Sequence, residues 1–212
     1  ATDFRRLHVF AAGPYGLGAL LGHRLFQALR GSRALIHYQF GGGGWRPWGP
    51  EWQVSPSARR SSFFEPQALS SRQQPGVRDL LLKVGITHHV CDDEVDPVLE
   101  GLRGPIATVT ALPARMGQDA IQYPDDIDPA ARELEALLFK AAAEYPNAGL
   151  HLFYPGPQVI LNRASSRLHL LPQSLTVYDR VRRESAFRFL PVIRFSPANV
   201  QLLVGPETGP KP

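Results

Sequence analysis

Five arginines gather near the carboxyl end of the chain and could bind phosphate. They are Arg180, Arg182, Arg183, Arg188 and Arg194, with Glu184 as the one acid between the first and the last. The planar guanidinium group matches the oxygens of a phosphate. The cluster therefore predicts an anionic partner. Ordinary solvated charges remain the alternative, because an arginine-rich composition is also typical of GC-rich genomes.

Two turns could also bind an anion. The chain reads Leu-His-Val-Phe-Ala-Ala-Gly-Pro at residues 7–14 and Leu-His-Leu-Phe-Tyr-Pro-Gly-Pro at residues 150–157, and a helical pattern follows each copy. A strand that turns into a helix places the unpaired amides of the helix at the carboxyl end of the strand. Neither turn has the spacing of a phosphate loop or a dinucleotide fingerprint, so a simple ATP or NAD site is not expected.

Hydrophobic spacing predicts the elements that position these turns. In the first half we expect strands at 7–12, 34–40 and 52–54, a helix over 17–30, a strand or helix at 77–84, a helix over 93–102 and a strand at 106–112. Residues 41–48 and 55–76 are expected to form loops, the second one long and mobile. In the second half we expect a helix with Asp128 as N-cap and Pro129 in its first turn, then a strand at 150–154, a helix after Pro157 and strands at 175–179 and 189–196.

The second unit repeats the first at a nearly constant offset. Leu150 follows Leu7 by 143 residues, and Tyr178 follows Tyr38 by 140 residues. The match continues through the helix and the third element of each unit. The chain therefore predicts an α/β fold of two related lobes with pseudo-two-fold symmetry. The helices differ, because 162–168 reads Asn-Arg-Ala-Ser-Ser-Arg-Leu where 21–25 reads Leu-Gly-His-Arg-Leu.

Composition excludes several classes of protein. The 212 residues contain one cysteine, Cys91, so no internal disulfide and no Cys-x-x-Cys zinc site can form. No apolar run approaches the roughly 20 residues of a membrane span, and the first residues do not resemble a secretion signal. We expect neither membrane contact nor export, and a cytoplasmic location.

No catalytic motif was found. The sequence has no Gly-x-Ser-x-Gly elbow, no His-Glu-x-x-His helix and no nuclease-like spacing of acids and lysine. The run His88-His89-Val90-Cys91-Asp92-Asp93 is interpreted as a loop that leads into an Asp-capped helix, not as a metal site. His8 and His151, at matching strand starts, are interpreted as structural, and Tyr38 and Tyr178 are equally compatible with core packing. No cofactor is expected.

The repeated phrase Leu-His-(Val/Leu)-Phe-x-x-Gly-Pro, the helix with Leu-Gly-His-Arg-Leu at 21–25 and strands that end in Tyr-Gln-Phe or Tyr-Asp-Arg resemble the SAVED domain of bacterial antiphage systems. The resemblance covers both units. It implies two fused CARF-like lobes that bind a cyclic oligonucleotide, made by a cGAS/DncV-like nucleotidyltransferase or a type III CRISPR complex. It also implies that binding assembles protomers and activates an attached or associated nuclease, TIR or protease effector.

The residues expected to bind such a ligand follow from both arguments. A ring of phosphates with splayed bases needs amide and guanidinium donors at its centre and flat side chains around it. The predicted ligand-binding residues are Pro14, Tyr15, Gly16, Phe40, Trp45, Arg46, Trp48, Thr110, Arg115, Tyr154, Pro157, Gln158, Arg180, Arg182 and Arg183.

The resulting interpretation is a non-enzymatic sensor for a cyclic tri- or tetranucleotide, expected to be an oligoadenylate. We expect a first lobe over 1–128, a linking helix and second lobe over 129–205, and a tail over 206–212. Two alternatives stay open, a ring-nuclease-like enzyme that cleaves its ligand and an RNA- or DNA-binding module. The main interpretation itself predicts no direct DNA binding.

Overall fold

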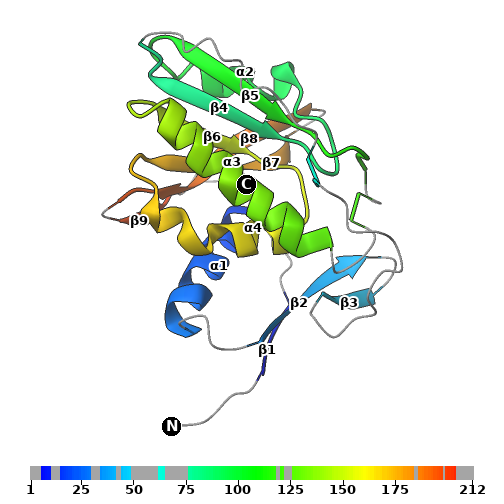
Figure 1. Ribbon diagram of the computed structural model, residues 1–212. Coiled ribbons are helices and arrows are strands. Elements are labelled where there is room, and N and C mark those ends of the chain that lie inside the picture. The colour runs from blue at the N-terminus through cyan, green and yellow to red at the C-terminus, as the bar shows by residue number, and fades with distance from the viewer. Residues whose placement is uncertain are drawn as a thin grey trace, which may run out of the picture.

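The computed structural model describes residues 6–10, 15–29, 34–41, 44–48, 62–64, 76–117, 120–121, 126–183, 186–197 and 199–203. Its strands form two sheets (Figure 1). The smaller sheet, in the order β1-β2-β3, contains β1 (Arg6–Phe10), β2 (Ala34–Gly41) and β3 (Gly44–Trp48). The larger sheet, in the order β5-β4-β6-β7-β8-β9, contains β4 (Asp79–Val84), β5 (Ile106–Ala111), β6 (Gly149–Phe153), β7 (Leu175–Arg183), β8 (Ala186–Phe195) and β9 (Val200–Leu202).

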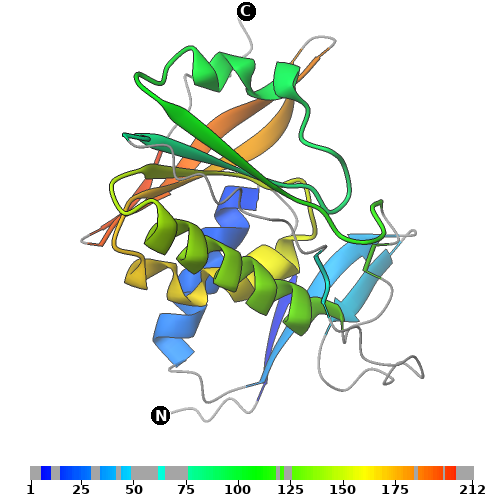
Figure 2. The same cartoon turned by 45° about the horizontal axis from the view of Figure 1, so that its top comes forward.

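Helices cover both faces of the larger sheet (Figure 2). One face packs against α1 (Tyr15–Leu29), α3 (Ile127–Glu144) and α4 (Gln158–Ala164), the last continued by the 3-10 helix η2 (Ser165–Leu170). The other face packs against α2 (Asp92–Leu99), whose Val95 lies in a cluster with Leu81, Phe153, Tyr178 and Phe189. The mixed α/β fold predicted from the sequence is confirmed.

The central strand explains why the segment 77–84 was ambiguous. A parallel strand that is covered on both faces reads as a continuous apolar run without alternation. Leu80, Leu82 and Val84 are fully buried on the α3 and α4 side, and Leu81 is buried on the α2 side. The segment is β4, which pairs in parallel with both β5 and β6.

The two predicted units have the same order of elements and the same register. In the first, β1 pairs in parallel with β2, Phe10 lies opposite Tyr38, and β3 follows antiparallel. In the second, β6 pairs in parallel with β7, Phe153 lies opposite Tyr178, and β8 follows antiparallel. A pseudo-two-fold axis between the units stays a prediction. So does the division at residue 128, and the hydrogen-bonded larger sheet crosses that position because β4 pairs with β6.

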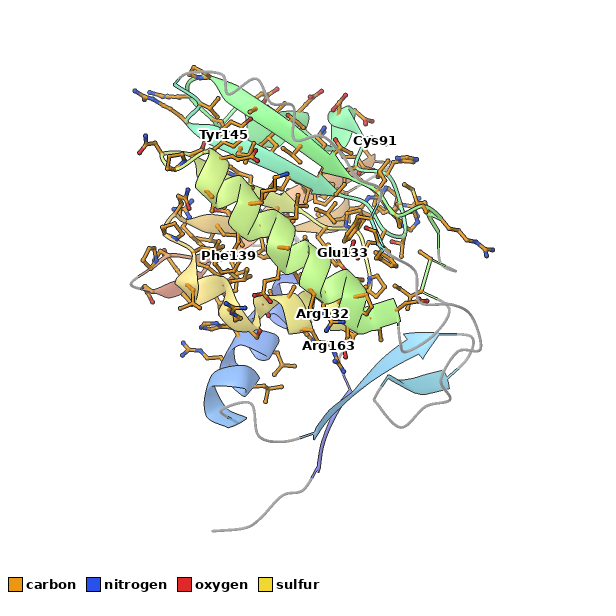
Figure 3. All side chains as sticks on the ribbon, in the orientation of Figure 1. Cys91, Arg132, Glu133, Phe139, Tyr145 and Arg163 are labelled. Atoms are coloured by element: carbon orange, nitrogen blue, oxygen red, sulfur yellow. The ribbon has the colours of Figure 1, made fainter. Side chains whose placement is uncertain are left out.

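Two local predictions were wrong, and a third cannot be compared with the structure. Trp45 and its neighbours do not lie in a loop, since β3 begins at Gly44 and pairs with β2. Asp128 is not the N-cap of α3, because Asp126 holds that position and the Asp128 carboxylate instead pairs with Arg163 of α4 (Figure 3). The predicted strand at 52–54 lies outside the described residues.

One part of the predicted loop at 55–76 is anchored. The backbone amides of Phe63 and Phe64 donate to the Glu133 carboxylate of α3 at 2.7 and 2.9 Å. Both phenyl rings are buried, and Phe64 forms a bridge with Pro113 in the loop after β5. For residues 62–64 the expectation of a mobile loop was therefore wrong, because a carboxylate and two buried rings hold them.

The helices of the two units pack closely. A Cβ at Gly22 of α1 would lie 2.0 Å from the carbonyl oxygen of Asn162 in α4, and one at Gly18 would lie 2.8 Å from the Asn162 Oδ1. Only glycine allows this approach at Gly22, since the atom met there is backbone. Two small residues four apart thus bring α1 against α4.

A buried polar cluster joins three strands of the larger sheet. His151 of β6 contacts the Tyr178 hydroxyl through Nδ1 at 2.8 Å and an oxygen of Asp79 through Nε2 at 2.9 Å. A carboxylate only accepts, so Nε2 carries the proton and Nδ1 accepts from Tyr178. Burial raises the pKa of Tyr178 to about 12, which keeps its hydroxyl protonated. The structural interpretation of His151 is confirmed by these contacts.

We expect this cluster to make stability fall in mild acid. Burial lowers the pKa of His151 below its ordinary value of 6.5, an effect that the Asp79 charge opposes and the Arg194 charge reinforces. Below pH 6.5 the unfolded state then binds this proton more readily than the folded state, so the free energy of unfolding decreases as pH falls towards the lower folded pKa. The stabilisation is fully present above pH 6.5. Chemical denaturation between pH 5 and 8 measures this loss.

The matched comparison uses His151→Gln, which keeps a polar group but removes the titration. Its free energy of unfolding should depend less on pH than that of the wild type. His89→Gln, at an exposed histidine, should leave the wild-type dependence unchanged. Equal pH dependence in wild type and His151→Gln would contradict the assignment.

Candidate ligand-binding edge

The carboxyl ends of the parallel strands define the candidate site. In the order β5-β4-β6-β7, the chain leaves β4 towards β5 on one side and leaves β6 towards β7 on the other. Open α/β sheets bind ligands at such a reversal, outside the carboxyl ends of the strands. The arrowheads of β2 and β5 lie on the same side of the molecule in both ribbon views (Figures 1 and 2). The two sheets thus present their carboxyl ends to one common side.

A single carbonyl joins the loops after β4 and β6. The oxygen of Pro155 accepts from the backbone amides of Ile86 and Thr87, at 3.1 and 3.0 Å, and from the Thr87 hydroxyl at 3.0 Å. The loop after β5 is tied to the same place, because the amide of Gly117 donates to the carbonyl of Ile86 at 3.1 Å. Three loops from three adjacent strands therefore meet at the reversal point.

The second Gly-Pro turn is built on a buried tyrosine. Tyr154 is fully buried, and its hydroxyl donates to the carbonyl of Pro157 at 2.9 Å. A Cβ at Gly156 would lie 2.6 Å from the Tyr154 ring, so the turn closes over the ring only with glycine at this position. Pro157 is the N-cap of α4, and Gln158 is the first residue of the helix. In this arrangement Tyr154 supports the turn, Pro157 is buried as well, and Gln158 is half-buried.

Thr110 and Arg115 lie at the same edge. Thr110 is half-buried in β5 and lies opposite Lys83 of β4 in the parallel register. Arg115 follows the strand by four residues and is exposed, and it makes no ion pair with the described residues. The structure therefore brings both residues close to the loops that meet at Pro155.

The three predicted arginines of β7 have different surroundings. Arg180 is bound to Glu94 of α2, with Nε 3.2 and 3.1 Å from the two carboxylate oxygens and a terminal nitrogen 2.5 Å from the first. Its guanidinium also stacks on Phe187 at 3.8 Å. Arg182 and Arg183 are exposed at the end of the β7-β8 hairpin, beyond the last residue of β7 that pairs with β6. The structure thus gives Arg180 a structural partner and leaves the other two at the surface.

The predicted residues of the first unit fall partly outside the described region. Pro14 is not described. Tyr15 and Gly16 are the first two residues of α1. Phe40 lies opposite Trp45 in the β2-β3 pair, with Arg46 opposite Gln39 and Trp48 opposite His37. The positions of these side chains lie outside the description, so their role in binding stays a prediction.

Sequence reasoning missed the charged residues around α2. Lys83, Asp92 and Glu94 form two ion pairs at the start of this helix, Lys83 with Asp92 and Glu94 with Arg180. A signal for the first was present, since Lys83 is the one charged residue in the run Leu80-Leu81-Leu82-Lys83-Val84. A charge inside a strand that is buried on both faces requires a partner.

The described residues contain no group of three or more His, Cys, Asp or Glu side chains placed to hold a metal ion. None of their helices has the length and apolarity needed to cross a membrane.

The fold resembles that of known ligand receptors. The Acinetobacter baumannii Cap4 SAVED/CARF-domain containing receptor with the cyclic trinucleotide 3'3'3'-cAAA is similar with a TM-score of 0.64 and 18% identity, over 90% of this chain and 38% of that chain. The structure of the same receptor with 2'3'3'-cAAA gives a TM-score of 0.62 and 17% identity, over 91% and 38%. The Moraxella osloensis Cap4 receptor gives 0.59 and 17%, over 91% and 37%.

The chain spans less than two fifths of the length of each of these three receptors. No curated protein sequence matches this chain significantly.

The family is shown by the sequence itself. The model of the SAVED family, described as the SMODS-associated and fused to various effectors sensor domain, matches residues 35–195. This range runs from β2 to the end of β8 and includes the loops that meet at Pro155. Since it covers well over half of the sequence, the chain belongs to the SAVED family of sensor domains.

Proposed function

We propose that this sensor domain binds a cyclic tri- or tetranucleotide at the carboxyl edge of its larger sheet. The observation that carries the proposal is the hydrogen bonding of three strand-end loops around the carbonyls of Pro155 and Ile86, within the range matched by the family. Exposed arginines lie at the same edge, with Arg115 after β5 and Arg182 and Arg183 on the β7-β8 hairpin. Guanidinium groups around a rim of polar loops suit a ring of phosphates.

The ligands of the similar receptors support the ligand class. Two of these structures contain cyclic adenosine trinucleotides that differ in linkage, 2'3'3'-cAAA and 3'3'3'-cAAA. The likeness in sequence is low, so the transfer of this ligand to the present chain is our proposal. We favour a cyclic oligoadenylate, with the ring size set by how the two sheets close around it.

Self-association and effector activation form the second part of the proposal. The family is described as fused to various effectors, which supports a regulatory role without catalysis by this domain. We propose that ligand binding brings protomers together and thereby activates a fused or associated effector. The exposed, unpaired Cys91 is compatible with the reducing cytoplasm, which we propose as the location.

A thermal-shift panel tests the ligand class. A ligand present at 100 times its dissociation constant stabilises the folded state by roughly 2.7 kcal/mol. We expect at least one cyclic tri- or tetra-adenylate to raise the melting temperature, and linear oligoadenylates of the same length to have little effect. A protein that no cyclic oligonucleotide stabilises would contradict the proposal. Equal shifts with linear RNA would favour the RNA-binding alternative.

A pair of arginines that flank β5 tests the position of the site. Arg115 lies after the carboxyl end of the strand, and Arg103 lies before its amino end. Both side chains are exposed, so their replacement should leave the fold intact. We expect Arg115→Ala to weaken ligand binding roughly ten-fold or more, the value of a charged hydrogen bond. Arg103→Ala should bind like the wild type, and titration calorimetry of both variants decides the matter. The opposite order of affinities would place the site at the other edge.

Mass measurement in solution tests assembly. We expect the mean mass of the protein to increase when the ligand found by the panel is added at saturation, because the ligand would complete a contact between protomers. Light scattering after size exclusion, with and without ligand, gives this mass. An unchanged mass at saturation would refute ligand-driven self-association and leave the binding proposal standing.

A further inference from the structure

Lys83 is a buried cation at the reversal point of the sheet. Its residue is 6% exposed, and it lies next to the last residue of β4. In the register of the sheet Thr110 of β5 and Phe153 of β6 are its neighbours. Two residues later, the chain enters the loop that is hydrogen-bonded to Pro155. An ammonium group is thus held just below the loops of the candidate site.

The Lys83 ammonium is paired with a solvent-exposed carboxylate. Lys83 donates from Nζ to an oxygen of Asp92, the first residue of α2. The Asp92 side chain is 91% exposed, whereas that of Lys83 is 8% exposed. The hydrogen bond and the charge of Lys83 lower the pKa of the Asp92 carboxyl, so Asp92 is ionised at neutral pH. A buried ammonium is costly without an anion, but an exposed carboxylate loses little when it moves into solvent.

The second ion pair of α2 shows the contrast. Arg180 and Glu94 are both largely buried, with side chains 17% and 8% exposed, and three hydrogen bonds and a stacked Phe187 hold them. Such a closed pair stabilises one arrangement of strand and helix. The pair of Lys83 has one partner, which is free to swing outwards. Lys83 can therefore exchange the Asp92 carboxylate for another anion.

We propose that Lys83 binds a phosphate of the ligand and that Asp92 occupies its ammonium until the ligand arrives. The inference rests on the proposed function. It adds Lys83 to the binding residues and an exchange of Asp92 for a ligand phosphate. An ammonium has three donors, and it donates to a phosphate oxygen as readily as to a carboxylate oxygen. The Thr110 side chain, a neighbour of Lys83 in the register, can donate its hydroxyl to the same phosphate. Asp92 then competes with the ligand and lowers its affinity.

Two substitutions of opposite expected effect test the exchange. Asp92→Asn removes the competing charge, so the affinity for the cyclic adenylate found by the panel, tested first with 3'3'3'-cAAA, should increase about two- to five-fold. Lys83→Met keeps an unbranched apolar stem but removes the cation. It should weaken binding roughly ten-fold or more and reduce the dependence of affinity on salt. Titration calorimetry at several salt concentrations measures both effects, with the fold of each variant verified by circular dichroism.

Matched controls separate the exchange from general charge effects. Asp93→Asn changes an exposed acid of the same helical turn, and Lys140→Met changes an exposed lysine of α3. Both should bind like the wild type. The structural alternative predicts that Asp92→Asn lowers the melting temperature without tighter binding, since it leaves a buried cation without its anion.

The outcomes are distinct. Tighter binding by Asp92→Asn alone, together with weaker binding by Lys83→Met, supports the exchange. If the wild type binds the ligand, three results would each overturn the exchange and leave the proposed function intact. The first is no increase in affinity in Asp92→Asn, the second is an equal increase in Asp93→Asn, and the third is full affinity in Lys83→Met. A wild-type protein that binds no cyclic oligonucleotide overturns both.

Discussion

The Pro155 carbonyl is the contact on which the arrangement of the candidate site depends. Three donors from the loop after β4 converge on this oxygen, which belongs to the turn after β6. A proline contributes no amide of its own, so this residue acts only as an acceptor and tolerates the crowded turn. Tyr154 and Gly156 hold the turn in place from below. The two loops that depart in opposite directions from the reversal point are thereby kept in contact, and the amides and side chains at their rim keep fixed positions.

The contact of α1 with α4 extends this constraint to the first unit. Gly22 brings the backbone of the first helix against the carbonyl of Asn162, and the buried Ser165 hydroxyl donates to the same carbonyl at 2.9 Å. The two Gly-Pro turns precede these two helices in the sequence. A fixed crossing of the helices therefore fixes the separation of their first residues, Tyr15 and Gln158. The helices are unequal, since α1 has 15 residues and α4 has seven before it tightens into η2. A symmetric ligand would meet two different walls.

The sequence predicted the α/β fold, whereas the ligand-binding residues stay predictions. Periodicity and turn residues placed β5, α3 and β6 correctly, because local spacing determines which face of each element is apolar. The repeat predicted two related units, and β6-β7-β8 pair in the same parallel and then antiparallel pattern as β1-β2-β3. Trp45 was misplaced because glycines on both sides of a short hairpin resemble a loop. Glu133, which binds the amides of Phe63 and Phe64, could not be predicted, since the contact joins segments that are 69 and 70 residues apart.

The arginine cluster shows why residue type alone does not define a phosphate site. A guanidinium binds whichever anion the fold brings to it, and α2 brings Glu94 to Arg180 while α3 brings Asp128 to Arg163 and Glu135 to Arg167. In each of these pairs an acid of the fold binds an arginine that, by residue type alone, could bind a phosphate. Whether an arginine is available to a ligand therefore depends on which acids lie near it. The position of those acids is set by the placement of the helices and not by the local sequence. Arg182 and Arg183 stay exposed because β7 extends beyond β6 and beyond the reach of those acids. Lys83 combines features of the paired and the exposed arginines. It is buried like Arg180, but its partner Asp92 is exposed to solvent.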